Sequence, residues 1–480
     1  MSLNYANSTV STKNNVPVIN WALFNNRANT DSAIPSEPAV GQCVFAKYYS
    51  SLNAGAPSFL LIPSRFKSGE LYAQIPTNGN GDLNVTRSLN GATRVNSSGL
   101  IESVASGIPR FDYFASNGTV GCPALLVEPS GTNLCLQSEN FSTTWSPTNV
   151  SISGNVTGTT DPAGGNTADQ IFETAASGTH FLEQTMTIVS GTTYVGSVFL
   201  KKAAVSPDWM QVAFSTTGLA GFANFNLTSG TVGLTGVGCT GRIENYGNGW
   251  YRCTLIQTAN ASGTSGGPVI VFTNNTNSAT RFVSYAGNAA TSIYAWGAQL
   301  ETGSVATSYI PTTTAAVTRN DDVVSVSGAV SGSIGQTEGS IYAEVNIQKL
   351  LGTTQRAFID IGQAGNRLFL GYGNGITDQI RFLLQTSGGG LVDFQSAATT
   401  TGIIRIAVGY KNNDSAMYVN GVSVSPISNG SFTATLTSLT QLSIGSSFNV
   451  GETHFLNDKI VEISLFNTRL SNTALQNMTL

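Results

Sequence analysis

The feature that most constrains the fold of this chain is an alternation of apolar and polar residues, interrupted by Gly, Asn or Pro about every ten residues. The alternation extends from about residue 140 to about residue 466. Side chains along a strand point to the two faces of a sheet in turn, so each segment is expected to form a short strand with one buried face. Helical periodicity is nearly absent. The sequence therefore predicts an all-β fold of antiparallel β-sandwiches.

Three local elements are especially clear. Residues 340–347 place isoleucine, alanine and valine on one face, which is typical of a strand. Asn420 and Gly421 separate two alternating segments, and because Asn-Gly favours a type I′ turn, they predict a β-hairpin. A short helix is expected over residues 473–478, because Ser471 can cap its first turn.

Composition suggests how the chain is divided. At 480 residues it is long enough for about three domains of roughly 150 residues each. Residues 1–73 are rich in proline and predict a small separate unit, and residues 74–130 are irregular enough to form an extended connector. Two sandwiches are expected at 131–311 and 336–480, joined by a linker at 312–335 that is rich in Thr, Ala, Gly and Ser.

Charge and cysteine usage exclude several classes of protein. Charged residues are 10% of the chain, with 22 Lys and Arg against 26 Asp and Glu, so no cationic stripe exists to bind a nucleic acid backbone. No apolar run reaches the roughly 18 residues of a membrane-spanning helix, and the first residues do not resemble a signal peptide. We therefore expect no membrane insertion. Five irregularly spaced cysteines predict free thiols in a reducing compartment, and only Cys239 and Cys253 are candidates for a bridge between neighbouring strands.

Several strings resemble bacteriophage fibre and tail-appendage proteins. Those of the connector region are Ala92–Glu102, Pro109–Tyr113, Leu125–Pro129 and Thr132–Leu134. The strings Gly249–Arg252, Tyr294–Glu301 and Ser308–Pro311 resemble the jelly-roll, carbohydrate-binding-module-like domain of such proteins. The segments Tyr418–Gly421 and Lys459–Ile463 resemble concanavalin A/laminin G-like sandwiches. The resemblance covers about residues 85–480.

This resemblance implies a virion protein that is assembled in the bacterial cytoplasm. It implies a homotrimer, other virion proteins as partners through residues 1–73, and a host-surface glycan as the ligand of the two sandwiches. A surface of neutral Ser, Thr and Asn suits that role because these side chains offer many short hydrogen-bonding groups.

No catalytic site is expected. The two histidines, His180 and His454, lie in different predicted domains, so neither a two-histidine zinc site nor a Ser/His/Asp arrangement is suggested. Concanavalin-like glucanases carry acids at alternate positions of one strand, whereas here the nearest string has Glu344, Asn346 and Gln348. An amide serves neither as nucleophile nor as general acid, so these three side chains are expected at most to bind a glycan by hydrogen bonds.

Aromatic side chains are the other candidates for a glycan site, because the apolar face of a pyranose packs on a flat ring. Trp209 follows a Ser-Pro-Asp loop and is the best candidate for an exposed ring, and Tyr246 is a further candidate. Tyr251 alternates with two apolar residues and is expected in the core, so that Trp250 faces outward. Trp296 is expected in the core.

Calcium is the one metal that the sequence suggests, because both kinds of sandwich often carry this ion on oxygen ligands. The candidate ligands are Asp360, Asp378 and Asp414, which lie near predicted turns.

The sequence thus predicts a structural virion protein, a fibre or appendage, that binds host-surface carbohydrate without catalysis. The alternative is a purely structural or decorating protein of the head, collar or tail. A polysaccharide depolymerase is the second alternative, and it would require a pair of carboxylates at catalytic separation.

Overall fold

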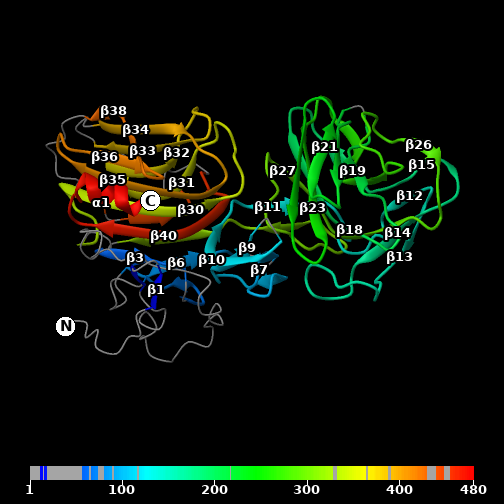
Figure 1. The fold of residues 1–480 in the computed structure, drawn as a ribbon, viewed down its shortest axis with the longest axis horizontal. Coiled ribbons are helices and arrows are strands. Elements are labelled where there is room, and N and C mark those ends of the chain that lie inside the picture. Colours follow the sequence, from blue (N-terminus) through cyan, green and yellow to red (C-terminus); the bar gives the residue numbers. More distant parts are fainter. Residues whose placement is uncertain are drawn as a thin grey trace.

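The computed structural model confirms a fold built almost entirely of antiparallel strands (Figure 1). It describes residues 11–13, 16–18, 57–63, 66–73, 81–88, 91–115, 118–216, 218–327, 332–363, 366–386, 391–429, 439, 441–447 and 454–480. Two β-sandwiches lie side by side, and the short strands β7 to β11 lie between them (Figure 1). Most of residues 1–73, the predicted docking unit, fall outside the described residues.

The first sandwich is assembled from two distant parts of the chain, and we call it the split sandwich. One sheet has the order β37 (Val422–Val424), β36 (Ala416–Val419), β35 (Gly402–Lys411), β30 (Glu338–Ile347), β40 (Asp458–Phe466), β10 (Val120–Val127) and β9 (Arg110–Phe114), with β3 (Phe59–Leu61) paired to β40. The other has the order β38 (Pro426–Asn429), β34 (Leu391–Ala398), β33 (Gln379–Gln385), β32 (Asn366–Tyr372), β31 (Arg356–Gln363), β39 (Gln441–Ile444), β29 (Val323–Ser327), β6 (Leu83–Thr86), β5 (Glu70–Leu71) and β4 (Phe66–Lys67).

The second sandwich lies between β10 and β29 in the chain, and we call it the inserted sandwich. Its β19 sheet has the order β12 (Ser146–Thr148), β16 (Phe181–Glu183), β25 (Val269–Phe272), β19 (Trp209–Ala213), β20 (Phe222–Asn226) and β21 (Thr231–Thr235). Its β18 sheet has the order β13 (Val150–Ser153), β14 (Asp169–Glu173), β27 (Ser292–Thr302), β18 (Thr193–Lys202), β23 (Trp250–Thr258) and β22 (Cys239–Asn245).

Short two-stranded ribbons and one helix complete the described fold. The ribbons are β1 (Ser11–Lys13) with β2 (Val16–Val18), β7 (Ala92–Val95) with β8 (Ile101–Val104), β11 (Gly131–Asn133) with β28 (Val317–Arg319), β15 (Ser177–Thr179) with β26 (Ser284–Ala286), and β17 (Thr185–Ile188) with β24 (Gly263–Gly266). Helix α1 is Asn472–Met478. Within the described ranges, no helix is long and apolar enough to cross a membrane.

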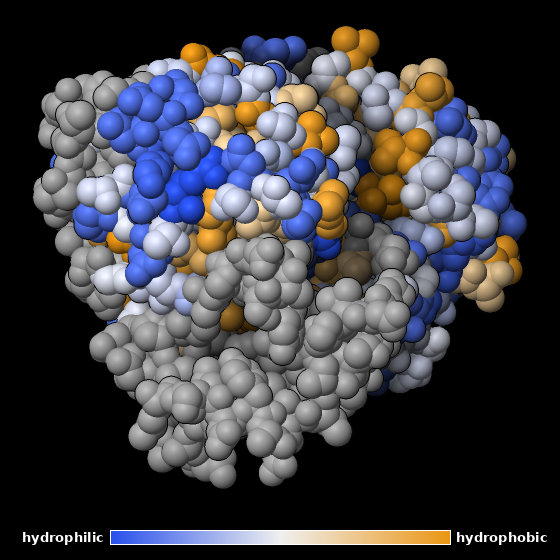
Figure 2. All heavy atoms as spheres, turned by 60° about the vertical axis from the view of Figure 1, so that its left-hand side comes forward, coloured by the Kyte–Doolittle hydropathy of each residue, from blue (hydrophilic) through white to orange (hydrophobic). Residues whose placement is uncertain are grey.

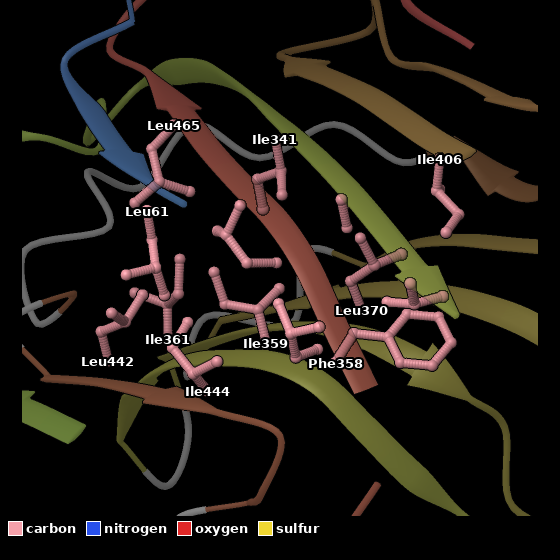
Figure 3. Packing of buried hydrophobic residues seen from close by; sticks show 14 of the residues in the cluster. Leu61, Ile341, Phe358, Ile359, Ile361, Leu370, Ile406, Leu442, Ile444 and Leu465 are labelled. Atoms are coloured by element: carbon pink, nitrogen blue, oxygen red, sulfur yellow. The ribbon is translucent and has the colours of Figure 1, made fainter. Parts of the chain in front are cut away.

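The core of the split sandwich joins segments from both ends of the chain. Leu61 of β3 packs beside Leu465 of β40, and both face Ile361 and Leu442 of the opposite sheet (Figure 3). Burial of such large aliphatic side chains is the main force that holds the two sheets together. The surface outside this core is mixed, with hydrophilic and apolar residues interspersed on the face seen in Figure 2.

The structure differs from the predicted division of the chain. The expected connector, 74–130, supplies β6, β9 and β10 to the split sandwich, and the expected linker, 312–335, supplies β29. In register, Val324 of β29 pairs with Val85 of β6, and Leu125 of β10 pairs with Ile460 of β40. The partners of these strands lie far away in the chain, and local periodicity does not show such pairing.

The local elements are confirmed. Strand β30 contributes Ile341, Ala343, Val345 and Ile347 to the core cluster. Strands β36 and β37 form the predicted hairpin, and Asn420 (φ 47°) and Gly421 (φ 79°) have the positive φ angles of a type I′ turn. Ser471 is the N-cap of α1, where its side chain accepts a hydrogen bond from the backbone N–H of Ala474.

The cysteines agree with expectation only in part. Cys135 and Cys253 are buried thiols and Cys239 is a half-buried one, whereas Cys122 is disulfide-bonded, which corrects the prediction that every cysteine is free. Cys239 and Cys253 lie on neighbouring strands but oppose Gln257 and Ile243, so they do not form a bridge.

Candidate functional site

Trp209 lies on the outer face of the β19 sheet, where its ring is partly exposed. Its neighbours Met210 and Val212 point into the core of the inserted sandwich, so Trp209 and Gln211 point the other way. The ring lies over Gly233 of β21, because a Cβ atom at this glycine would come within 2.5 Å of the indole Cζ3. Trp209 therefore presents the flat, partly exposed aromatic surface that the sequence predicted.

Two asparagines of the loop after β25 flank this ring. The Oδ1 of Asn275 accepts hydrogen bonds from the backbone N–H groups of Asp208 (2.6 Å) and Trp209 (3.2 Å). The Oδ1 of Asn277 accepts from the backbone N–H of Leu234 at 2.7 Å. A Cβ atom at Gly233 would come within 2.3 Å of this same oxygen, so Asn277 packs directly against the glycine. Both asparagine side chains are exposed. The site thus combines an aromatic ring with amides, which is the composition expected of a glycan-binding surface.

A buried chain of amides lies behind these groups on the same sheet. Gln211 donates its Nε2–H to Asn224 Oδ1 at 2.9 Å, and Asn224 donates to Asn277 Oδ1 (3.1 Å) and to the backbone carbonyl of Ser278 (2.7 Å). Gln211 and Asn224 have no exposed surface. Buried amides that find such partners hold a loop in one position, so they fix residues 273–283 against the sheet.

Charges beside Trp209 are internally paired. The Lys202 ammonium forms an ion pair with Asp208, and it also donates to Thr228 Oγ1 at 2.8 Å. Hydrogen bonds from Lys202 and Thr228 lower the pKa of the exposed Asp208 carboxyl below its ordinary value. Asp208 is therefore ionised at neutral pH and balances the lysine.

Trp250 is buried, and Tyr246 is half-buried with its ring engaged by neighbouring aromatics. Trp250 faces outward from its own sheet, as predicted, but it is 1% exposed because Val95 and Ile101 of the β7–β8 hairpin pack in the same cluster. Its indole N–H donates to the carbonyl of Thr160 at 2.8 Å. Tyr246 stacks on Phe114 at 4.3 Å between ring centroids, and burial raises the pKa of its hydroxyl. Trp296 is buried in this cluster too, as expected.

Glu344, Asn346 and Gln348 lie on the split sandwich, so the structure does not bring them to Trp209. Glu344 accepts hydrogen bonds from Arg405 (2.9 Å) and from the Tyr342 hydroxyl (2.8 Å). Asn346 is half-buried, and Gln348 donates its side-chain amide to the Phe114 carbonyl at 3.3 Å. Two of the three side chains are thus already engaged in contacts within the protein.

The predicted calcium ligands are separated. Asp360 forms a two-pronged ion pair with Arg367 (2.8 and 3.0 Å), Asp414 pairs with Arg469 (3.0 Å), and Asp378 accepts from a backbone N–H at 2.9 Å. Among the described residues, no three His, Cys, Asp or Glu side chains lie close enough to hold a metal ion. The structure does not bring the three aspartates together, and each carboxylate has a separate partner within the protein.

Sequence reasoning missed a buried ion cluster between the two sandwiches, which we call the junction cluster. Its members are Arg87, Arg110, Glu128, Arg319 and Asp322, each 3% exposed or less. Asp322 pairs with Arg87 (2.9 Å) and with Arg110, and Glu128 pairs with Arg110 (2.8 Å). Burial alone would raise the pKa of both carboxyls, but the guanidinium groups outweigh it and hold each pKa below its usual range. Arg110 and Glu128 belong to two of the strings that resemble phage fibre proteins. Because both side chains are buried and ion-paired, their contacts serve the folded structure.

Comparison with known proteins identifies no family for this chain. No protein-family model matches the chain, and no curated protein matches it. Similar solved structures include the CBM40 domain of a Ruminococcus gnavus IT-sialidase (14% identity, 30% of this chain, 84% of that chain, TM-score 0.25). Domain 4 of AbnA, a GH43 extracellular arabinanase from Geobacillus stearothermophilus, in complex with arabinotriose, is another (14% identity, 33% of this chain, 73% of that chain, TM-score 0.26). The binding domain of Botulinum neurotoxin DC, in complex with rat synaptotagmin II, is a third (14% identity, 33% of this chain, 40% of that chain, TM-score 0.27).

Proposed function

We propose that this chain binds carbohydrate without catalysis through the surface around Trp209. The observation that carries the proposal is a partly exposed indole, seated over Gly233 and flanked by the exposed amides of Asn275 and Asn277. A pyranose ring packs its apolar face on such a ring, while amides take up its hydroxyl groups.

The biological setting is a further part of the proposal. The strings with a phage-fibre resemblance support a virion appendage that presents its sandwiches to host-surface glycan. In that setting the chain is a homotrimer that docks to other virion proteins through residues 1–73. Several weak sites on one particle would act together, because linked sites gain from a high effective concentration.

The test is a Trp209→Ala variant of the full chain, measured against an array of bacterial surface glycans and then by titration calorimetry. We expect binding to fall roughly tenfold or more, because the stacking surface is lost. Trp209→Phe, which keeps a ring, is expected to bind at an intermediate level. Ile427→Ala, which removes a 61% exposed side chain from the split sandwich, is the control and is expected to bind as the parent does.

Two outcomes would replace the proposal. Unchanged binding by the Trp209→Ala protein, or no binding by the parent, would favour a purely structural role. The depolymerase alternative is tested in parallel because Glu344 lies directly opposite Glu462 across two strands. Release of reducing ends from host polysaccharide by the parent, lost in Glu344→Gln, would identify an enzyme.

A further inference from the structure

The asparagines around Trp209 share one feature that determines what kind of ligand they accept. Asn226, the cross-strand partner of Trp209, accepts on Oδ1 from the backbone N–H groups of Thr228 and Ser229, each at 2.9 Å. Asn275 and Asn277 also use Oδ1 to accept from backbone N–H groups. A backbone N–H only donates, so each amide is held with its oxygen toward the protein.

The nitrogen end of each amide is consequently directed away from these bonds. The Asn275 side chain also forms a hydrogen bond to the Asp208 carboxylate, so its Nδ2 group is in use. Within the part of the chain that the structure describes, the Nδ2 groups of Asn226 and Asn277 donate to no other residue. Asn275 and Asn277 are exposed and Asn226 is half-buried. The surface therefore offers fixed hydrogen-bond donors around the indole, with the amide acceptors already in use.

The charged side chains near Trp209 further restrict the class of ligand that this surface can bind. The lysine nearest to Trp209, Lys202, is paired with Asp208, so it offers no unbalanced cation to a carboxylate or sulfate. The Arg281 guanidinium lies away from Trp209, because it donates a hydrogen bond to the backbone carbonyl of Phe214 at 2.7 Å. Phe214 is five residues after Trp209, which corresponds to roughly 16 Å along an extended strand. An acidic sugar would thus find no free positive charge beside the ring.

We propose that the Trp209 surface selects a neutral glycan whose ring or hydroxyl oxygens accept hydrogen bonds from the Nδ2 group of Asn277. This inference rests on the proposed function and adds the ligand class and one specificity-determining residue. Gly233 acts as a positioning residue, since any larger side chain there would displace both the indole and Asn277.

The decisive variant is Asn277→Asp. A carboxylate keeps the oxygen that accepts from the backbone N–H of Leu234, so the loop stays in place, but the amide donor is lost. Asn140→Asp is the matched control, because Asn140 also accepts on Oδ1 from a backbone N–H, that of Ser142 at 3.1 Å. All variants are made in the full chain, and thermal unfolding verifies that each is folded.

The probes are cellohexaose, maltohexaose and mannohexaose as neutral ligands and a hexamer of galacturonic acid as the acidic one, each titrated by calorimetry. We expect a neutral hexamer to bind best, with an affinity that added NaCl does not change, since screening acts only on charges. Asn277→Asp is expected to bind it about tenfold more weakly, because one hydrogen bond to the ligand is lost, and Asn140→Asp is expected to match the parent.

The outcomes separate this inference from the proposed function. Tightest binding of the acidic hexamer, still lost in Trp209→Ala, would overturn the neutral ligand class and leave the carbohydrate site intact. Parent-like affinity of Asn277→Asp would overturn the role of this donor. Binding that Trp209→Ala does not change would overturn the proposed function itself.

Discussion

The two outer faces of the inserted sandwich carry tryptophans at equivalent kinds of positions, yet only one face presents a ring to solvent. On the β18 sheet, Trp250 and Trp296 are each 1% exposed, because the β7–β8 hairpin and Phe114 cover them. On the β19 sheet, Trp209 is partly exposed and the covering loop, 273–283, contributes amides beside it. The difference shows that an outward-facing aromatic stays partly exposed only where the segments packed beside it leave its ring uncovered.

The cover on the β18 sheet is held by polar contacts as well as by packing. Arg110 donates to the carbonyl of Thr93 in β7 at 3.1 Å, and the Thr93 hydroxyl donates to the carbonyl of Tyr309 at 2.5 Å. Arg110 belongs to the junction cluster, so this cluster connects the hairpin to both sandwiches. Loss of the cluster is therefore expected to disturb the covered face and spare the open one.

The largest effect is expected from Asp322→Ala. This change leaves Arg87, Arg110 and Arg319 buried with only Glu128 to balance them. Removal of one partner from a buried ion cluster costs about 4–5 kcal/mol of unfolding free energy, because the remaining charges stay out of water. Urea unfolding followed by tryptophan fluorescence measures the loss, and Glu102→Ala, at the partly exposed Arg94–Glu102 pair, is the control with less than about 1 kcal/mol.

An unchanged unfolding free energy of the Asp322→Ala variant would contradict the idea that the junction cluster holds the cover on the β18 sheet. The comparison of the two faces would fail if this variant lost glycan binding at Trp209 while still folded, because the open face makes no contact with the junction cluster among the described hydrogen bonds.

A smaller effect is expected from the pair Trp250→Ala and Trp209→Ala. Trp250→Ala removes a fully packed ring and its hydrogen bond to Thr160, and it is expected to cost about 3–4 kcal/mol. Trp209→Ala removes a partly exposed ring and is expected to cost about 1 kcal/mol while abolishing most glycan binding. Equal destabilisation by the two variants would contradict the distinction between the faces.

Local signals predicted the elements whose stability depends on neighbours in the chain. The Asn420–Gly421 turn, strand β30 and the Ser471 cap each depend on φ angles or on side-chain alternation within about ten residues, so they can be read directly. The face assignment of Trp250 and Tyr251 followed from alternation too. Its exposure did not, since the covering residues, Val95 and Ile101, lie far earlier in the chain.

Long-range pairing explains the other errors. Residues 74–130 seemed to form a connector because their strands β6 and β10 pair with β29 and β40, which lie far later in the chain. The partners of the candidate calcium ligands were not predicted either, because Arg367 and Arg469, which pair with two of the three aspartates, are identified only by the fold. A signal for the candidate site existed in the density of asparagines at 274–277, but only the structure shows that their oxygens are bound to backbone N–H groups.

The smallest expected effect is a pH dependence of the unfolding free energy. It depends on a buried carboxyl, Asp458, next to the segment that covers the β18 sheet. Asp458 is buried and accepts from the backbone N–H groups of Gln348 (2.8 Å) and Lys349 (3.1 Å), and Gln348 in turn holds Phe114 beneath the cover. Burial raises the pKa of Asp458 to about 6 and outweighs the opposing effect of Lys349, Arg356 and Lys459.

The native state therefore holds a proton on Asp458 between pH 4 and pH 6 that the unfolded chain releases, so this group makes stability fall as pH rises through that window, by at most about 3 kcal/mol. Glu128 and Asp322 act in the opposite sense, since their lowered pKa values make stability fall only as pH drops below about 4. Asp458→Asn keeps an oxygen for the two N–H groups and is expected to remove the decline between pH 4 and 6. Unfolding free energies across this range check it, and a variant that keeps the parent's slope would assign the proton to another group.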